Sequence, residues 1–166
     1  STVLLSYSAP NLHRMWGPTN VLVSMLNKHS PIATRLQAMD GKCTWKAKHN
    51  ALLCQMECDE NRLQECTQAL VRGLDNYRIN GRQCTTEIQQ LGAVTNSLRF
   101  NASELSKQAL MNSLYTAGDP NFVPTQAYRI ENLKKTDPGV VQGLLESVRR
   151  LAPRVGTVNV SDHEAV

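Results

Sequence analysis

The chain has 166 residues, a net charge of +4 and 41% hydrophobic residues. This size and composition suit one compact domain or one extended helical element, and they exclude a disordered polymer. Aromatic residues make up only 5%, fewer than a compact core of this length usually contains. Long helices that pack through narrow apolar stripes need fewer rings, because Leu, Ala and Met fill such stripes well. The composition therefore favours helices packed side by side.

Residues 1–42 form the first predicted segment, a series of short helices. Thr19 or Asn20 could cap a helix that carries Val21, Leu22, Met25 and Leu26. Ser30 followed by Pro31 predicts a second helix, with Ser as N-cap and Pro at the first helical position.

The composition of this N-terminal segment also bears on location. Residues 1–39 contain no acid but hold five serines together with Arg14, Lys28 and Arg35, which is typical of a mitochondrial transit segment. No run of about 18 apolar residues occurs anywhere, so we expect no transmembrane helix. We predict an intracellular protein, with mitochondrial and cytoplasmic locations as the alternatives.

A basic group with an aromatic residue at its centre follows, formed by Lys42, Trp45, Lys46 and Lys48. Basic grooves with stacking rings bind single-stranded nucleic acid, so these four residues are a candidate contact for an acidic partner. The alternative, which we favour, is that Trp45 packs the N-terminal helices against the next segment.

Residues 43–117 are predicted to form a long helical segment, and no Pro occurs from Thr44 to Thr116. Apolar residues recur every seventh position through this segment, at Met56, Leu63, Leu70, Tyr77, Cys84, Leu91, Leu98 and Leu105. A strict seven-residue repeat predicts a left-handed supercoil, because it keeps one stripe of the helix facing a partner. These eight residues are therefore the predicted helix–helix interface.

The second apolar stripe of this segment drifts between two heptad positions, which favours packing in a helical bundle over an ideal two-stranded zipper. Gly73, Gly92 and the turn dipeptide Asn80-Gly81 are weak points within it. Since the repeat continues in phase through Asn80-Gly81, we expect one continuous helix rather than a hairpin.

Residues 118–166 are predicted to form a linker, two helices and an extended or loose tail. One helix should run from Thr125 to Lys135. A second should begin at Asp137 as N-cap with Pro138 in the first turn, and end before Pro153.

The five cysteines give no strong metal or disulfide pattern. Cys54 and Cys58 on one helix face, with His49 one turn earlier, could supply half a zinc site, but no second pair is spaced to complete it. Cys66 and Cys84 could form a disulfide only if the long segment doubled back. We favour free thiols that act as small hydrophobic side chains, and we predict no metal and no cofactor.

The histidines give no catalytic signature either. None of His13, His29, His49 and His163 lies in a recognisable general-base context, and no phosphate-binding or nucleophile motif occurs. We therefore expect no enzymatic activity and assign no catalytic residue.

Together these patterns predict an all-α protein: a long coiled-coil or bundle helix with short flanking helices. The predicted function is that of a non-catalytic structural or assembly subunit of a larger complex, which binds other subunits or itself through the heptad stripe. The alternative is a basic nucleic-acid-binding or nucleocapsid-like protein.

Overall fold

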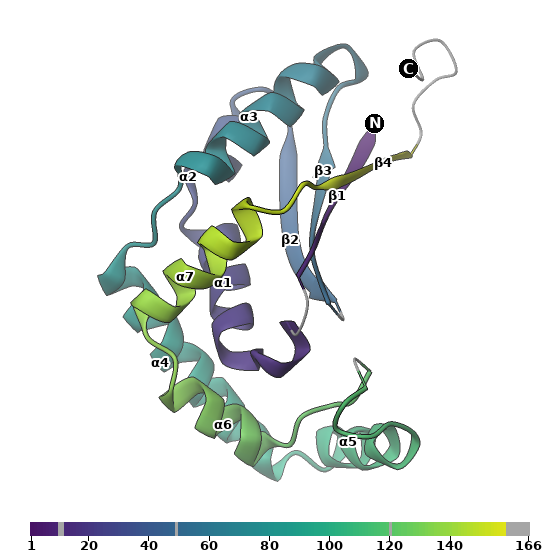
Figure 1. Ribbon diagram of the computed structural model, residues 1–166, viewed down its shortest axis with the longest axis vertical. Coiled ribbons are helices and arrows are strands. Elements are labelled where there is room, and N and C mark those ends of the chain that lie inside the picture. Colours follow the sequence, from purple (N-terminus) through teal and green to yellow (C-terminus); the bar gives the residue numbers. More distant parts are fainter. Residues whose placement is uncertain (10–11, 49, 120, 159–166) are drawn as a thin grey trace.

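A computed structural model describes residues 1–9, 12–48, 50–119 and 121–158 of the chain (Figure 1). It contains a four-stranded antiparallel sheet in the order β2-β3-β1-β4, in which both neighbours of β1 run antiparallel to it. The strands are β1 (Thr2–Ser8), β2 (Lys42–Lys48), β3 (Ala51–Glu57) and β4 (Arg154–Val158). The prediction of an all-α coiled-coil protein is therefore wrong, because a mixed sheet-and-helix fold replaces it.

The strands form because their side chains alternate between apolar and polar, so that one face of the sheet can be buried. In β1 the buried side chains are Val3, Leu5 and Tyr7, whereas Leu4 and Ser8 between and after them are exposed. Strands β2 and β3 bury the same face of the sheet as β1. Trp45 on β2 is buried beneath the helices, and so is Cys54, its direct partner on β3. Leu52 and Met56, on either side of Cys54 along this face of β3, are buried as well.

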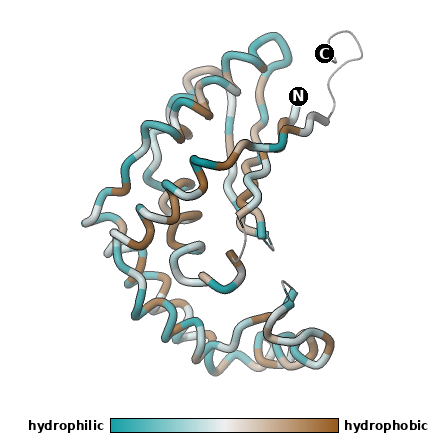
Figure 2. Tube along the Cα trace, viewed as in Figure 1, coloured by the Kyte–Doolittle hydropathy of each residue, from teal (hydrophilic) through white to brown (hydrophobic). Residues whose placement is uncertain are grey.

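Helices cover this inner face of the sheet and continue beyond it in a curve (Figure 1). They are α1 (Trp16–Lys28), α2 (Pro31–Gln37), α3 (Leu63–Asn76), α4 (Gly81–Ser97), α5 (Ala102–Leu114), α6 (Gln126–Lys134) and α7 (Pro138–Arg149), with short 3-10 turns η1 (Leu12–Arg14), η2 (Glu60–Arg62) and η3 (Leu98–Phe100). Apolar positions recur along α1 and α7 (Figure 2), whereas β2 carries Lys42, Lys46 and Lys48. Helix α1 is buried against this layer through Val21, Leu22, Met25 and Leu26.

The expected continuous helix from Thr44 to Thr116 is wrong. Its first part is the β2–β3 hairpin, and the remainder divides into α3, α4 and α5. Helix α3 ends at Asn76 because Tyr77 has extended backbone angles, and the guanidinium of Arg149 donates hydrogen bonds to the carbonyls of Leu74 and Tyr77. Asn80 then caps α4 by accepting a hydrogen bond from the backbone N–H of Gln83 at 3.1 Å. The residues between α3 and α4 therefore end one helix and start another, although the seven-residue repeat continues through them.

Three of the predicted helix starts are confirmed, but the first is wrong, because α1 begins at Trp16 and Thr19 and Asn20 lie inside it. The side chain of Ser30 accepts from the backbone N–H of Ile32, with Pro31 in the first turn of α2. Asp137 caps α7 in the same way, with Pro138 in its first turn, and Thr125 caps α6. The predicted loose tail includes β4, and its residues 159–166 lie outside the described part of the chain.

The two edges of the sheet differ. At the β2 edge, the side-chain amide of Asn27 accepts from the backbone N–H of Trp45 at 2.8 Å and donates to its carbonyl at 2.9 Å. Asn27 thereby satisfies edge groups that another strand would otherwise bind. The opposite edge is β4, whose described residues pair only with β1. No helix within the described ranges is long and apolar enough to cross a membrane.

Candidate functional site: a pocket at the end of the sheet

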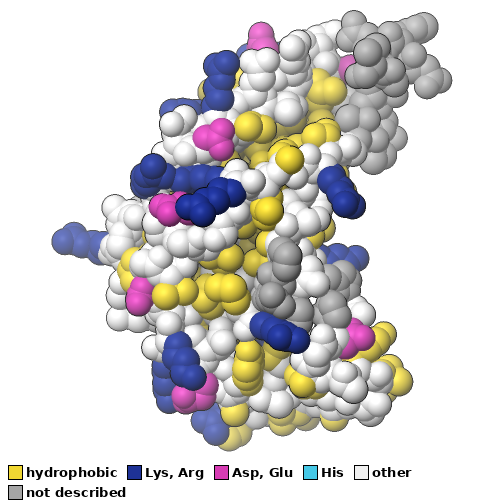
Figure 3. Space-filling view, in the orientation of Figure 1, with side chains coloured by type: hydrophobic (Ala, Val, Ile, Leu, Met, Phe, Trp, Pro, Cys, Tyr) yellow, Lys and Arg dark blue, Asp and Glu magenta, His cyan; other side chains and the backbone are white. Residues whose placement is uncertain are grey.

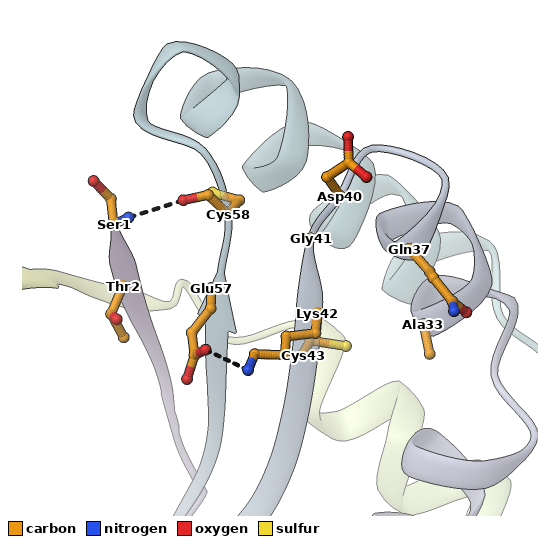
Figure 4. A pocket seen from close by; sticks show the side chains of 10 residues that line it. All are labelled: Ser1, Thr2, Ala33, Gln37, Asp40, Gly41, Lys42, Cys43, Glu57 and Cys58. Atoms are coloured by element: carbon orange, nitrogen blue, oxygen red, sulfur yellow. Dashed lines mark hydrogen bonds and ion pairs between the residues drawn. The ribbon is translucent and has the colours of Figure 1, made fainter.

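A pocket of about 690 Å³ opens where the first residues of β1 and β2 meet the end of β3 (Figure 4). Helix α2 closes its other side. Its walls combine charged, polar and thiol groups, contributed by Ser1, Thr2, Ala33, Gln37, Asp40, Gly41, Lys42, Cys43, Glu57 and Cys58.

The turn from α2 into β2 shapes this pocket. The N–H of Gly41 donates to the carbonyl of Leu36 at 2.8 Å and so ends the helix. Asp40 has a φ of 56°, in the left-handed region that non-glycine residues rarely adopt. A Cβ on Gly41 would lie 3.3 Å from the carbonyl oxygens of both Leu36 and Glu57. Glycine at position 41 therefore lets the loop approach β3 closely and brings Asp40 to the pocket rim.

An exposed ion pair lies across the pocket. Lys42 and Glu57 face each other in the β2–β3 register, and Lys42 Nζ lies 2.8 Å from Glu57 Oε2. The hydrogen bond between them raises the pKa of Lys42 and lowers that of Glu57. Because both side chains are open to solvent, the pair positions charge at the pocket rather than stabilising the fold strongly.

Two pairs of thiols lie beside the pocket. Cys43 and Cys58 line it, and a more deeply buried thiol lies behind each, Cys54 behind Cys43 and Cys66 behind Cys58. The hydrogen bond from Cys54 lowers the pKa of Cys43 and raises that of Cys54, while burial raises the pKa of Cys58 to about 11. Among Cys43, Cys54 and Cys58, Cys43 is therefore the thiol that most readily ionises.

No metal site emerges from these groups. Within the described ranges, no three His, Cys, Asp or Glu side chains come together as they would around a metal ion. The zinc half-site that we considered and did not favour lacks its assumed geometry, since Cys54 lies in β3 and Cys58 follows the strand, rather than both lying on one helix face. His49 lies outside the described residues. The chemistry available at the pocket is that of a nucleophilic thiol, together with carboxylates and an ammonium group.

A second polar centre lies between α1 and α4, around the buried carboxylate of Glu87. It accepts a hydrogen bond from Ser24 at 2.5 Å and contacts Lys28 and His29 at 2.9 Å each. Burial raises the pKa of Glu87, but the hydrogen bonds from Ser24, His29 and Lys28 outweigh it and hold the pKa at about 2. Both Ser24 and His29 contact the carboxylate, and no contact joins them to each other in a serine–histidine relay. This centre fastens α1 to α4.

The predicted basic contact is divided between two faces of the sheet. Lys42, Lys46 and Lys48 lie exposed on the outer face, whereas Trp45 is 1% exposed and points into the core. Its ring packs near Tyr7, with centroids 6.3 Å apart. The favoured interpretation of Trp45 as a packing residue agrees with this placement. The ring projects from strand β2 into the core, however, and not from the start of a long helix. A stacking ring is therefore absent from among these three lysines.

The eight heptad residues are distributed over several elements instead of one helix. Met56 lies in β3, Leu63 and Leu70 in α3, and Tyr77 just after α3. Cys84 and Leu91 lie in α4, Leu98 in η3 and Leu105 in α5. Met56, Leu70, Tyr77 and Cys84 are buried in the core, whereas Leu105 is exposed. These residues do not form a single stripe.

Three features were not recognised in the sequence: the thiol pairs, strand β2 and the partners of Glu87. Cys43 and Cys54 become neighbours through strand pairing, and Cys58 and Cys66 through the turn into α3. The sequence suggested Cys66 and Cys84 as a pair, but the environment of Cys84 is set by burial, Asp137 and Glu87. One signal could have revealed β2, namely the two-residue alternation of polar with less polar side chains through residues 42–48. The polar positions are Lys42, Thr44, Lys46 and Lys48, and the positions between them are Cys43, Trp45 and Ala47. The partners of Glu87 lie too far away in sequence for any local pattern.

Solved structures show what this fold resembles. A conserved protein from Enterococcus faecalis matches with a TM-score of 0.65 at 12% identity, over 93% of this chain and 42% of that chain. A protein described as a predicted insulinase family protease from Yersinia pestis matches with a TM-score of 0.62 at 16% identity, over 96% and 41%. A chain of Complex III from Candida albicans matches with a TM-score of 0.57 at 10% identity, over 88% and 39%.

The chain thus spans less than half the length of these solved chains. No protein-family model and no curated protein sequence matches it. At identities this low the likeness is one of fold alone, shared with solved structures described as an insulinase family protease and a putative M16-like peptidase.

Proposed function

We propose that this chain is a non-catalytic domain of M16-peptidase type that acts as an assembly unit, packing against a second protein domain through a surface on α5. This α5 surface comprises Leu105, Leu110 and Leu114 on α5, which are 43%, 62% and 66% exposed, together with Val94 on α4 and Phe100 in η3, which are 55% and 85% exposed. The proposal depends on this single observation. Apolar side chains also gather at the lower right of Figure 3, where α5 lies in Figure 1.

Helix α5 needs a cover for a physical reason. It has 13 residues and no buried side chain, and isolated helices shorter than about 12–15 residues are marginally stable in water. Leu110 and Leu114 are one turn apart and so share a face of the helix. Burying that face against a partner would stabilise the helix and remove apolar surface from water.

The second domain is the partner that the comparisons favour. The similar solved chains are more than twice as long as this one, so the matching part of each belongs to a larger polypeptide. One similar chain belongs to Complex III, a complex by its description. A second domain, in the same polypeptide or in another subunit, would therefore cover the α5 surface.

The absence of catalysis is part of the proposal. None of the four histidines is followed by the x-x-Glu-His that completes the zinc-binding motif of inverzincin peptidases. The pocket at the end of the sheet also brings no histidine to its walls. Hydrolysis of an unstructured peptide by the purified chain, abolished by a chelator, would contradict this part.

Sedimentation velocity tests the assembly role. The purified chain should self-associate with rising concentration, because no natural partner is present in the sample to cover its α5 surface. The double variant Leu110→Ser/Leu114→Ser should be monomeric under the same conditions.

A matched control is Leu4→Ser/Val140→Ser, which removes two other exposed apolar side chains, one on the outer sheet face and one on α7. It should associate as the unmodified chain does. A wild-type chain that stays monomeric while the amides of α5 resist hydrogen exchange would overturn the proposal, because α5 would then need no cover.

The intracellular location, with mitochondria as one alternative, also stands as a proposal. Residues 1–39 supply β1, α1 and α2, so this acid-free segment belongs to the folded core. Fractionation of cells that express the tagged protein checks where it resides.

A further inference from the structure

Cys43 differs from the other cysteines in its access to solvent. It is half-buried and lines the pocket of about 690 Å³, whereas Cys54, Cys58, Cys66 and Cys84 are all buried. In Figure 4 its sulfur is directed from β2 towards the side of the pocket formed by α2. A reagent that enters the pocket therefore meets this sulfur.

Two buried donors surround the Cys43 sulfur. The first is the thiol of Cys54, which stays protonated because its own pKa is raised. The second is the indole N–H of Trp45, which has no hydrogen-bond partner in the described structure although the side chain is almost completely buried. This N–H does not reach hydrogen-bond geometry with the thiol, yet it lies close enough to lower the pKa of Cys43.

An unpartnered buried donor destabilises the folded state, so the Trp45 N–H calls for an explanation. A thiolate is a stronger acceptor than a thiol. Ionised Cys43 would supply the partner that the indole N–H lacks and would also accept from Cys54. The surroundings of Cys43 are therefore built to hold a negative sulfur.

The strand register excludes the simplest fate of this thiolate, a disulfide with Cys54. Cys43 pairs with Met56, and Cys54 pairs with Trp45, so the two cysteines are diagonal neighbours. Diagonal residues lie about 7–8 Å apart, beyond the roughly 4.4–6.8 Å between Cα atoms that a disulfide spans. Cys54 is thus a positioning residue that donates to Cys43, and the electrophile must come from outside.

We propose that Cys43 is a modification site at which a small disulfide of the glutathione type enters the pocket and forms a mixed disulfide with the protein. The Cys43 thiolate attacks one sulfur of the incoming disulfide. A new sulfur–sulfur bond forms, the old one breaks, and the released thiolate leaves with the electron pair and takes a proton from water.

The pocket fits such a ligand by charge as well as by size. A glutathione-type peptide carries carboxylates and an ammonium group. The rim offers the exposed Lys42–Glu57 ion pair, whose ammonium group can face the carboxylates and whose carboxylate can face the ammonium group, and Asp40 adds a second carboxylate. The titratable side chains that share the pocket with Cys43 are Asp40, Lys42, Glu57 and Cys58, and α2 adds only Ala33 and Gln37.

Mass spectrometry of the folded chain after incubation with glutathione disulfide tests the site. We expect one glutathionyl group per chain, located on Cys43 by peptide mapping and absent from Cys43→Ser. Cys84→Ser is the matched control, since Cys84 is buried and lies outside the pocket, and it should be modified like the wild type.

The positioning roles are tested by the pH dependence of Cys43 alkylation with iodoacetamide. The wild-type midpoint should lie below the ordinary thiol value of about 8.5. Cys54→Ala and Trp45→Phe should each raise this midpoint and slow the reaction at neutral pH by up to about tenfold, because a smaller fraction of the thiol is then ionised. The far-UV circular dichroism should stay unchanged. If one variant fails to fold, the other variant and the wild-type midpoint still test whether buried donors lower the pKa of Cys43.

Three results would overturn the proposal: a wild-type midpoint at or above the ordinary value, labelling of Cys58 or Cys84 as fast as Cys43, or a Cys43–Cys54 disulfide in place of the adduct. None of these bears on the α5 surface, so the site and the assembly role are tested separately.

Discussion

At the scale of single residues, Glu87 shows how one buried charge can connect two helices. Its carboxylate contacts Ser24, Lys28 and His29, all on or just after α1, from its own place on α4. A buried carboxylate is tolerable only when hydrogen bonds and opposite charge compensate its lost hydration. Here three donors do so.

This arrangement makes stability depend on pH. The pKa of Glu87 falls from 4.5 to about 2 on folding, so its contribution is fully present above pH 4.5 and is lost as the pH falls towards 2. Glu87→Gln should lower the free energy of unfolding by about 3 kcal/mol at neutral pH. This difference from the wild type should shrink as the pH falls from 4.5 to about 2. Urea denaturation at a series of pH values measures it.

The control for this prediction is Glu131→Gln, which removes an exposed carboxylate paired with Lys134 within α6. It should change little, because solvent screens that pair. If the two variants show the same pH slope, Glu87 does not hold α1 to α4 as described.

At the scale of elements, Gly73 shows why a residue that weakens an isolated helix can be required in a packed one. A Cβ at position 73 would lie 2.7 Å from Cγ1 of Ile32 on α2, whereas a Cβ at Gly92 on α4 would meet nothing within 4 Å. The same substitution should therefore have opposite effects at the two sites.

Gly92→Ala should stabilise the protein by up to about 1 kcal/mol, the helix-propensity difference between the two residues. Gly73→Ala should instead destabilise it by roughly 1–2 kcal/mol, because the forced separation of α2 and α3 outweighs that gain. Chemical denaturation of both variants gives the comparison. Stabilisation by Gly73→Ala would show that the α2–α3 contact is looser than described.

Elements with local signals could be predicted from the sequence, and those that depend on distant pairing could not. The starts of α2 and α7 follow from Ser30 and Asp137, whose capping acts within three residues. The β2–β3 hairpin was missed because a seven-residue apolar repeat took precedence over the two-residue alternation of Lys42–Lys48. The sheet itself could not be inferred, since β1 and β4 meet only after the chain folds.

The candidate site was hidden for the same reason. Cys43 and Cys54 were each visible in the sequence, but their contact arises from the β2–β3 register. The unpartnered N–H of Trp45 is a property of packing that no spacing rule encodes.

At the scale of the whole molecule, the segments predicted as 1–42, 43–117 and 118–166 share one core. Strand β1 from the first segment lies between β3 from the second and β4 from the third. Helix α1 has buried residues that face this same layer, and Arg149 on α7 binds the end of α3. Such interdependence predicts that the three segments unfold together.

In the Trp16→Phe variant, fluorescence reports on Trp45 within the sheet alone, while far-UV circular dichroism reports mainly on the helices. The two urea transitions should have coincident midpoints, as in a two-state protein. A helical signal that survives after the fluorescence change is complete would show that the helices form a separate unit.

The central position of β1 also affects how the protein is made. Synthesis delivers β1 first, yet residues 9–153 must follow before β4 begins to emerge and cover its second edge. Until then one edge of β1 is unpaired, and the strand can pair with other chains through this edge. The strand also carries Val3, Leu5 and Tyr7, which are buried only in the folded protein. The ribosome-bound protein thus passes through a long interval in which one edge of β1 is not yet covered by β4.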